Sequence, residues 1–522
     1  MLKKLALPII LLVALLMRVW NFTTLALWHD EAFSALLIRM PFDEMMRRIA
    51  LDVHPPFYYW LLDVWANIFG HSLASLRGFS VLFGVATVFM LYVLIKKITQ
   101  SQRLSLAAAA LLAVNPFHIQ YSLEARMYTL GTFLVVASTW VLLKALETNK
   151  WKWWLPYALL TTASALNHYF MFFSIAAQGL FVLVWWVKNY GKDFLRLRLR
   201  QAGHAWRWLG AYVLAAVLYI PWLPTFWKQF SQVQESYWIP KMDIWSVPLT
   251  IWKILLGGFQ WAPQNVLIIT AIIFLALLLI YFYKYRGMNY LFIGMMAIIP
   301  FVLAILVSLK TALFLDRYFI FAAMFITTIL AASLLSIRYK KIGLGLLVAM
   351  LVGSVISYAD GLKTIDAKNR PGMTAASQYI FDHYPIRCPQ NVASAPEKVI
   401  VSSTFIYFSY QYYYELYFDQ IRGASLACEM KITPEPILYL QGITHVNQLP
   451  HFSGTALLED HDFVGNLSAF AKKGETVMLL WTTGFGGNKP EVPSNWQEMD
   501  EQKFPDVFNH RGEIFVTKYL IK

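Results

Sequence analysis

Long runs of apolar residues constrain this chain more than any other feature of its sequence. A helix needs about 20 such residues to cross a bilayer core of roughly 30 Å, and the shorter runs must extend or tilt to do so. Because lipid offers the backbone no hydrogen-bond partners, each run is predicted to be an α-helix. The predicted spans are 5–20, 79–95, 104–117, 129–146, 154–167, 170–187, 209–224, 265–282, 288–309, 318–336 and 342–358.

Composition supports an integral membrane protein. Of the 522 residues, 58% are hydrophobic and 14% are charged, whereas about 25% of the residues in soluble proteins are charged. The 20 Trp, 28 Tyr and 37 Phe residues suit a membrane interface and also surfaces that stack on sugars. The net charge is +14, and basic residues sit in short loops such as "KNYGKDFLRLRLR" and "SIRYKK". Such loops are typical of cytoplasmic topology signals, so we expect no nucleic-acid partner.

The basic loops also predict an orientation. With eleven spans, all of these loops fall on one side, which is the cytoplasm by the positive-inside rule. The N-terminal "MLKKLALPIILLVALLMRVW" is then an uncleaved first span with a cytoplasmic N-terminus, in a multi-pass protein of the inner or plasma membrane. The basic residues concerned are Lys3, Lys4, Lys96, Lys97, Lys150, Lys152, Lys284, Arg286, Arg338, Lys340, Lys341 and the run from Lys188 to Arg207.

Two domains are predicted. Residues 1–358 form the transmembrane domain, and residues 359–522 lack long apolar runs and form an extracytoplasmic soluble domain. Strand-like runs in the second domain ("KVIVSST", "PILYLQ", "TVMLLWTT", "EIFVTKYLI") alternate with helix-like ones ("FIYFSYQYYYELYF", "LSAFAKK"), which favours an α/β arrangement. The aromatic run could stack on sugars, but a packed aromatic helix is favoured. Cys388 and Cys428 are either a disulfide or two free thiols.

Two external loops are predicted, at 21–77 and 225–264. In the first, "FYYWLLDVWANIF" is too short to span, and we interpret it as an amphipathic helix in the outer interface. The residues at helical spacing on its apolar face are Phe57, Trp60, Leu61, Val64, Trp65 and Ile68.

Polar clusters occur at the outer ends of the predicted spans. The positive-inside rule predicts few arginines on the outer side, so the presence of Arg77, Arg126 and Arg317 there requires an explanation. Ionisable groups at a membrane boundary are candidates for function. The four clusters are His29-Asp30-Glu31, His54-Pro55-Pro56, Glu124-Ala125-Arg126-Met127-Tyr128 and Asp316-Arg317-Tyr318.

Each cluster also has a structural interpretation. Asp30 and Glu31 could lie in a solvated loop or cap a helix beginning near Ala32; in a helical first turn their side chains diverge by about 100°, so one could act while the other holds the loop. In "HPPFYYW", the paired prolines stiffen the chain and start a helix, and this structural role holds whether or not His54 has a function. His168, in "NHYF", is more readily a satisfied interfacial histidine than a catalytic one.

The remaining clusters leave further alternatives open. If "QYSLEARMYTL" is helical, Gln120, Glu124 and Tyr128 share a face and Arg126 points elsewhere; otherwise the segment is partly loop. Glu124 is either a structural partner of an arginine or a functional group. For Arg126 and Arg317 we favour anion binding, because a guanidinium grips phosphate through two parallel hydrogen bonds.

Two further pairings are plausible at these span ends. Asp316 could simply pair with Arg317. Arg77, which opens the second span from the outside, could pair with Asp30, Glu31 or Glu124.

The absence of several motifs narrows the chemistry. Asp30, Glu31, His54 and His168 fit no recognised metal spacing, and the sequence has no Walker A motif and no GxSxG elbow. One carboxylate with two arginines beside a membrane fits a single inverting displacement at a sugar carbon. Asp30 would act as the base while Arg126 and Arg317 bind a lipid phosphate leaving group.

The same residues carry a family resemblance. In order, "LWHDEAFSALL", "HPPFYYWLLDVWANIFGHSLASLRGFSVLFG", "NPFHIQYSLEARMYTLGTF", "NHYF" and "DRYFIFA" resemble the GT-C membrane glycosyltransferases. They are most similar to the bacterial branch of protein O-mannosyltransferase and aminoarabinose-transferase-like (family 39-like) proteins. The resemblance covers roughly residues 5–340. It implies a GT-C fold, a polyprenyl-phosphate sugar donor and transfer on the outer face to a protein, lipid or glycan.

The resemblance also implies roles for particular residues. Asp30 would be the base, and Glu31 would support the loop or the acceptor. The family leaves a divalent metal open, and this chain shows no clear equivalent. The predicted phosphate site comprises Arg126, Arg317, Tyr128 and His54, and the supporting residues are Arg77, Glu124, His168 and Tyr318.

A rival hypothesis is a lipid or polysaccharide transporter, and a third is a non-catalytic scaffold. Transporters place polar residues in mid-span and often show inverted repeats, whereas these polar clusters lie at span ends and no repeat is evident. A scaffold leaves the outer arginines unexplained.

Overall fold

The computed structural model describes residues 2–190, 206–235, 239–258, 262–383, 398–424, 436–449, 454–507 and 512–522. Contacts between residues divide the chain into two compact units. The first unit comprises Met1–Trp20, Val53–Leu61 and Arg77–Gly361. The second comprises Asn21–Asp52, Leu62–Leu76 and Leu362–Lys522. Cys388 and Cys428 lie outside the described residues.

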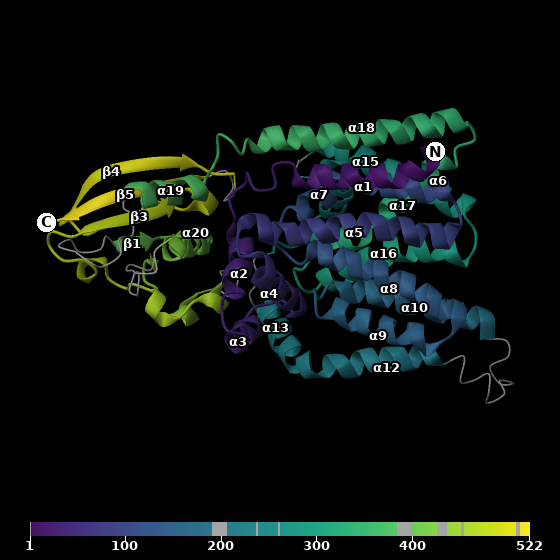
Figure 1. Cartoon of the computed structure of the whole chain (residues 1–522), viewed down its shortest axis with the longest axis horizontal. Coiled ribbons are helices and arrows are strands. Elements are labelled where there is room, and N and C mark those ends of the chain that lie inside the picture. The colour runs from purple at the N-terminus through teal and green to yellow at the C-terminus, as the bar shows by residue number, and fades with distance from the viewer. Residues whose placement is uncertain are drawn as a thin grey trace. The chain divides into compact units, whose positions relative to one another are not determined.

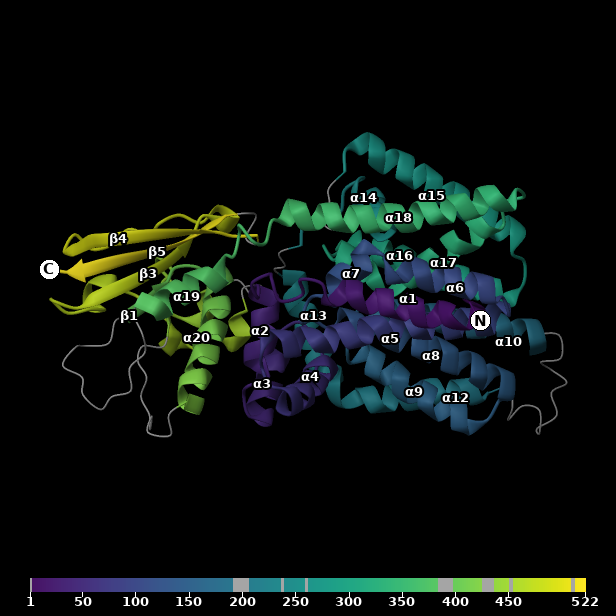
Figure 2. The same cartoon turned by 45° about the horizontal axis from the view of Figure 1, so that its top comes forward.

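The first unit is built from long helices that run side by side (Figures 1 and 2). Each of the eleven predicted apolar runs forms a helix, so the prediction of a helical membrane protein is confirmed. The helices are α1 (Leu2–Val19), α5 (Leu73–Thr99), α6 (Gln102–Ala113), α7 (Pro116–Ser122), α8 (Tyr128–Thr148), α9 (Trp151–Ala165), α10 (Met171–Tyr190), α12 (Arg207–Tyr219), α13 (Leu223–Glu235), α14 (Ser246–Trp252), α15 (Gln264–Lys284), α16 (Met288–Ser308), α17 (Ile320–Leu335) and α18 (Lys340–Ile365).

Eight helices in the described part of the chain are long and apolar enough to cross a membrane, or nine if the bent pair α6–α7 counts as one span. One prediction needs correction. The predicted external loop 225–264 does not start at residue 225, because the helical path of α12 continues through Ile220–Trp222 into α13. Pro221 and Pro224 fall at the joins, where proline is tolerated in the first turn of a new helical segment.

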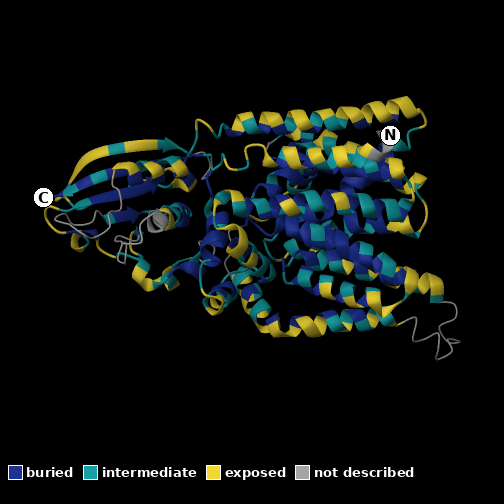
Figure 3. Cartoon of the chain, in the orientation of Figure 1, coloured by how far each residue is buried: buried dark blue, intermediate teal, exposed yellow. Residues whose placement is uncertain are grey.

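Burial separates central from peripheral helices in this unit. The span of α17 is 94% buried, and α17 packs against α6, α8, α10, α15 and α16. In contrast, the span of α15 is 11% buried and exposes Ile272 and Leu279. The span of α18 is 22% buried, and Figure 3 shows exposed residues along much of this helix. Such apolar faces are what a helix presents to lipid.

Helix α4 (Phe57–Phe69) forms where the short amphipathic helix was predicted. The side it buries carries Tyr58, Tyr59 and Leu62, whereas Val64 and Ile68 on the predicted apolar face are exposed. The apolar face is therefore not a core face. It is available for the interfacial role that its sequence predicts.

The second unit contains a five-stranded sheet of order β2-β1-β3-β5-β4. Strands β1 (Lys398–Val401), β2 (Ile437–Leu438) and β3 (Thr476–Thr482) are parallel, and Ile400 lies opposite Leu479. Strand β5 (Glu513–Ile521) pairs antiparallel with β3, and the edge strand β4 (Trp496–Pro505) pairs antiparallel with β5. Helices α19 (Met373–His383) and α20 (Thr404–Ala424) complete this α/β part (Figure 1).

The second unit matches most of its sequence predictions. The four strand-like runs form β1, β2, β3 and β5, and the aromatic run forms α20 with Tyr410 and Tyr412 buried. The helix predicted at "LSAFAKK" is wrong: only Leu467–Ala469 form a 3₁₀ turn. Strand β4 was not predicted, because "WQEMDEQKFP" is a mostly exposed edge strand without an apolar alternation.

The second unit also includes part of the first long loop. Helices α2 (His29–Leu37) and α3 (Phe42–Leu51) belong to it, and α2 packs on α20. The division into folding domains at residues 358 and 359 stays a prediction. By contacts, residues 21–52 and 62–76 group with the C-terminal part of the chain.

Candidate active site

The loop that carries Arg126 follows a broken helix in the first unit. Helices α6 and α7 meet at 58°. Asn115 caps α7, because its side chain accepts a hydrogen bond from the His118 backbone at 2.9 Å, and Pro116 occupies the first turn. Residues 123–127 then form bends and a turn before α8 begins at Tyr128. The partly-loop alternative for this segment is therefore the one observed.

A buried arginine satisfies the carbonyls at that break. The Arg18 side chain, on α1, is fully buried and donates to the carbonyls of Ala113 at 2.9 Å and Leu112 at 3.4 Å. It also donates to Ser122 Oγ at 3.1 Å and His118 Nδ1 at 2.8 Å, both on α7. Carbonyls at a helix end need such partners. Arg18 thus fixes how α7, and the loop after it, leave α6.

Arg126 itself is buried among polar side chains of α4 and the segment before it. Its Nη2 lies 3.5 Å from His54 Nε2, and its Nη1 lies 3.5 Å from the Tyr59 hydroxyl. Both distances are long for hydrogen bonds. Asn167 Nδ2 donates to the Met127 carbonyl at 3.1 Å and so holds the Arg126 loop to the turn between α9 and α10.

His168, on that turn, joins the same cluster. Its ring centroid lies 5.9 Å from that of His54, 4.8 Å from that of Tyr318 and 6.1 Å from that of Tyr128. His168 Nδ1 accepts a hydrogen bond from the Phe170 backbone at 3.2 Å. Burial lowers the pKa of His168 well below its usual value of 6.5, and nearby positive groups including Arg126 and Arg317 lower it further. His168 is therefore neutral near pH 7.

Asp316 and Arg317 lie in a short 3₁₀ turn, Asp316–Phe319, before α17. Asp316 forms an ion pair with Lys253, from the π-helical turn Lys253–Gly257. Its Oδ1 also accepts from the backbone N–H of Arg317 at 2.7 Å. The expected Asp316–Arg317 pairing thus runs through the Arg317 backbone, and the ion pair goes to Lys253, which sequence reasoning missed.

A cavity of about 720 Å³ adjoins the polar cluster. His54, His168 and Tyr318 line it together with aromatic rings such as Phe172 and Phe226. Tyr169 and Gln229 also line the cavity. Trp222 Nε1 donates a hydrogen bond to the Tyr169 hydroxyl at 3.0 Å, and that hydroxyl is hydrogen-bonded to Gln229, so these bonds fix part of the cavity wall. The cavity belongs to the first unit and is mostly apolar, in the size range of small-molecule sites, about 300–1,000 Å³.

Asp30 and Glu31 lie in the second unit, in the first turn of α2. Trp28 is the N-cap, so the capping interpretation of the two carboxylates is not the one observed. Glu31 is buried and Asp30 is half-buried. The His29 ring packs 5.7 Å from Phe405 and 5.4 Å from Phe408 on α20.

The predicted site residues thus fall into two groups. Within the first unit, His54, Arg126, Tyr128, His168 and Tyr318 come together, and the Arg317 charge acts on His168. Glu124 lies in the Arg126 loop, where its carbonyl accepts from the Arg126 backbone at 2.8 Å, and Arg77 is buried in α5. Asp30 and Glu31 form the second group.

Sequence reasoning missed Arg18 and Tyr59. The signal for Arg18 was present, since an arginine inside an apolar span is a functional candidate by default. Tyr59 gave no signal of its own, because it belongs to an aromatic run. The four residues considered for a metal are divided between the two units, and no cluster of three His, Cys, Asp or Glu suited to a metal occurs in the part of the chain that is described.

The long helices with polar clusters at their ends, together with a separate α/β unit, define a multi-pass membrane protein with a GT-C glycosyltransferase fold. Residues 53–224, which are less than half of the chain, match the family described as dolichyl-phosphate-mannose-protein mannosyltransferase, so this region is similar to that family. No curated protein matches the chain.

Solved structures support the fold over the whole chain. A crystal structure of ArnT from Cupriavidus metallidurans bound to undecaprenyl phosphate matches with a TM-score of 0.55 and 13% identity, covering 99% of this chain and 97% of that one. The apo crystal structure of the same protein gives 0.54 and 13%, with coverage of 98% and 97%. At such identity the likeness concerns the fold, and because it covers nearly the whole chain it extends to the second unit.

The protein O-mannosyltransferase Pmt1–Pmt2 complex of S. cerevisiae, bound to its sugar donor, also matches, with 18% identity over 44% of this chain and 34% of that one. Its TM-score is 0.36, too low for a comparison of folds.

Proposed function

We propose that this protein is an inverting glycosyltransferase that moves a sugar from a polyprenyl-phosphate-linked donor to a hydroxyl group of a protein, lipid or glycan. The observation that carries the proposal is the contact between Arg126 and His54, because His54 also lines the large apolar cavity. A polyprenyl-phosphate donor has the two matching parts, an anionic phosphate and an apolar chain. ArnT, whose fold this chain shares, has been crystallised with undecaprenyl phosphate.

The arginines are proposed to bind the donor phosphate. A guanidinium stays charged and offers parallel N–H groups that match two phosphate oxygens. Arg126 is buried, and a charge in such surroundings interacts more strongly than one in water. Arg317 would neutralise the phosphate as it leaves. His54 and the Tyr128 hydroxyl would add hydrogen bonds, and neutral His168 would line the site without adding charge.

Asp30 is proposed to be the base. The acceptor oxygen attacks the anomeric carbon of the sugar, its proton passes to the Asp30 carboxylate, and the bond between that carbon and the phosphate oxygen breaks with inversion. The lipid phosphate leaves as an anion, which needs charge stabilisation and little protonation. Glu31 supports the first turn of α2 or meets the acceptor. This assignment rests on the sequence resemblance and on the position of Asp30 in a helical first turn.

Orientation is part of the proposal. The basic loops favour a cytoplasmic N-terminus, and the second unit then faces the outside, in a bacterial inner membrane or another plasma membrane. Transfer would take place on the outer face, where lipid-linked sugars serve as donors because soluble nucleotide sugars are confined to the cytoplasm.

The test is a transfer assay with the purified protein in lipid nanodiscs, using a panel of labelled polyprenyl-phosphate sugars and membrane extracts as acceptors. Loss of a general base predicts that Asp30→Asn lowers kcat by about 100-fold or more. The matched control is Asp43→Asn, which removes an acid from the first turn of the next helix, α3, and should leave kcat within about twofold of wild type.

Two results would count against the proposal. Equal rates for Asp30→Asn and Asp43→Asn would remove the assignment of the base. A wild-type protein that consumes none of the donors, but moves lipid-linked sugars across vesicle membranes, would favour the transporter hypothesis.

A further inference from the structure

The segment that carries Asp30 is bound to the C-terminal part of the chain at several points within the second unit. At the start of α2, the Leu27 backbone N–H donates to the Tyr413 hydroxyl on α20 at 2.9 Å. The same hydroxyl accepts from Thr374 Oγ1 on α19 at 2.9 Å. At the other end of α2, Arg39 Nη1 donates to Asp419 at 2.8 Å. Both ends of the nine-residue helix are therefore tied to the α19–α20 pair.

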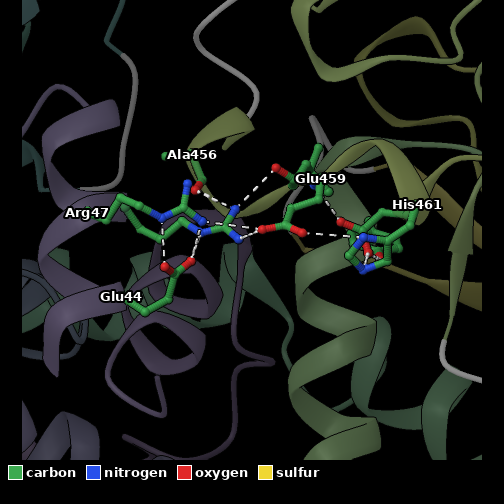
Figure 4. Close-up of polar contacts among 9 residues, drawn as sticks. Glu44, Arg47, Ala456, Glu459 and His461 are labelled. Atoms are coloured by element: carbon green, nitrogen blue, oxygen red, sulfur yellow. Dashed lines mark hydrogen bonds and ion pairs between the residues drawn. The ribbon is translucent and has the colours of Figure 1, made fainter. Parts of the chain in front are cut away.

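Helix α3 is tied to the loop around Glu459 by a buried arginine. Arg48 forms ion pairs with Glu44, on its own helix, and with Glu459. Its Nη1 donates to the carbonyls of Ala456 and Leu458, both at 3.2 Å. Figure 4 shows this group, with Glu44 and Arg47 on the left, Glu459 and His461 on the right, and Ala456 above the arginine side chains. One guanidinium therefore serves four acceptors: Glu44 on its own helix and three at residues 456–459, about 410 residues away in sequence.

The neighbouring arginine makes similar pairs in a different environment. Arg47 contacts Glu44 at 2.6 Å and Glu459 at 3.3 Å, but its side chain is 55% exposed, against 7% for that of Arg48. An exposed ion pair contributes little, since water and salt screen it, whereas removing one member of a buried network leaves the other members unpaired. Arg48 therefore carries the attachment of α3, and Arg47 adds little.

We propose that the C-terminal part of this chain is a positioning device for the base of the transfer reaction, and that Arg48 is its central positioning residue. Arg48 holds α3, the short connection at residues 38–41 joins α3 to α2, and the α19–α20 pair holds α2 itself. The proposal rests on the proposed function, since it assumes that Asp30 is the base. It assigns the α/β part a role in catalysis separate from any contact with the acceptor.

The physical reason is the tolerance of catalysis to displacement. A shift of about 1 Å in a reacting group can cost on the order of 100-fold in rate. A nine-residue helix in a loop between membrane helices does not hold such a position by itself, because helices shorter than about 12 residues are marginal in water. The contacts to α20 and Glu459 supply the missing constraint.

The test compares Arg48→Gln with Arg47→Gln in the full-length protein in nanodiscs. Two readouts are used: hydrogen exchange of residues 29–37 and 42–51, and transfer kinetics. For Arg48→Gln we expect exchange in both helices to rise by about tenfold or more and kcat to fall by about 10- to 100-fold. The KM for the lipid donor and the affinity for polyprenyl phosphate should stay within twofold of wild type. For Arg47→Gln, all of these values should stay within about twofold of wild type.

The split between kcat and KM distinguishes positioning from general damage, because a misfolded protein would lose donor binding as well. If Arg48→Gln fails to fold, Glu459→Gln replaces it, since Arg48 then keeps Glu44 and the two carbonyls. Equal exchange and equal kcat in the Arg48 and Arg47 variants overturn the proposal. If the wild type transfers no sugar, the proposed function fails, and hydrogen exchange alone still decides whether Arg48 holds the two helices.

Discussion

The two units bury an arginine in opposite ways. In the first unit, Arg18 hydrogen-bonds to neutral groups: three carbonyls, the Ser122 hydroxyl and the His118 ring. In the second, Arg48 pairs with the carboxylates of Glu44 and Glu459 as well as with two carbonyls. The guanidinium of Arg18 completes a broken helix, and that of Arg48 joins two separate segments by charge.

The surroundings explain this difference. A regular membrane helix uses most of its own carbonyls, and the break between α6 and α7 leaves those of Leu112 and Ala113 to be satisfied by a side chain. The second unit offers ionised carboxylates at its surface, which can pair with an arginine at less cost in desolvation. The first arrangement should therefore depend on exact shape, and the second on charge and pH.

The largest expected effect is that of Arg18→Gln. The shorter amide cannot reach the acceptors at the α6–α7 break, which should lower the free energy of unfolding by roughly 3 kcal/mol and weaken donor binding through the Arg126 loop. Thermal unfolding in detergent and binding of polyprenyl phosphate measure these changes. Arg103→Gln, at an exposed position on α6, is the control. Equal stability of the two variants would show that the break does not depend on Arg18.

A smaller effect is expected for Gly84→Ala, which tests the shape of the same network. An added Cβ would lie 2.5 Å from Ser122 Oγ and 3.1 Å from Arg18 Nε. Overpacking of this kind costs about 1–3 kcal/mol. Gly345→Ala on α18 has nothing within 4 Å of the new atom and should be neutral or slightly stabilising. The difference between the two melting temperatures is the measurement, and a null difference would contradict the close approach of α5 and α7.

His168 should make the first unit sensitive to mild acid. Its pKa lies well below 6.5 in the folded protein because of burial. Below pH 6.5 the unfolded chain therefore takes up a proton that the folded chain does not, and stability falls as the pH falls. His168→Gln should reduce this slope in melting temperatures between pH 8 and pH 5. His383→Gln, at an exposed position, should retain it.

The smallest effect is expected for Glu44→Gln in the second unit. Hydrogen bonds from Arg47 and Arg48 lower the pKa of Glu44 to about 2. Its contribution is therefore complete above about pH 4.5 and is lost as the pH falls toward 2. Because Glu44 is partly exposed, we expect less than about 1 kcal/mol at pH 7. Hydrogen exchange of residues 42–51 should therefore show a larger difference from wild type at pH 7 than at pH 3.

Some elements were predictable from sequence because their patterns were local. The apolar runs of the first unit and the apolar strands β1, β3 and β5 could be predicted from the composition of each segment alone. Strand β4 could not be predicted in this way, because an edge strand whose two faces are both exposed to solvent needs no alternation of apolar and polar residues. The residues at 57–69 were predicted to be a helix, but the face that packs, with Tyr58 and Leu62, was not the more apolar one.

The candidate site was predictable only in part. Arg126, His54 and His168 stood out because charged or polar groups at span ends are uncommon. His54 and His168 line one cavity, and Arg126 lies beside His54. This arrangement depends on a turn at residues 166–170 lying beside residues 53–57, where the Phe57 N–H donates to the Leu166 carbonyl at 2.9 Å. No local pattern encodes a contact between segments more than a hundred residues apart.

The sequence by itself determined that the chain is a bundle of membrane helices followed by an α/β part, because hydrophobic length and strand patterning are properties of short segments. Only the tertiary structure decided the partners of the buried charges. Arg18 donates a hydrogen bond to the Ala113 carbonyl at the helix break, Lys253 pairs with Asp316, and Arg48 pairs with Glu459. A buried ion or hydrogen bond is chosen by which groups packing brings within about 3 Å, and packing is a property of the whole fold.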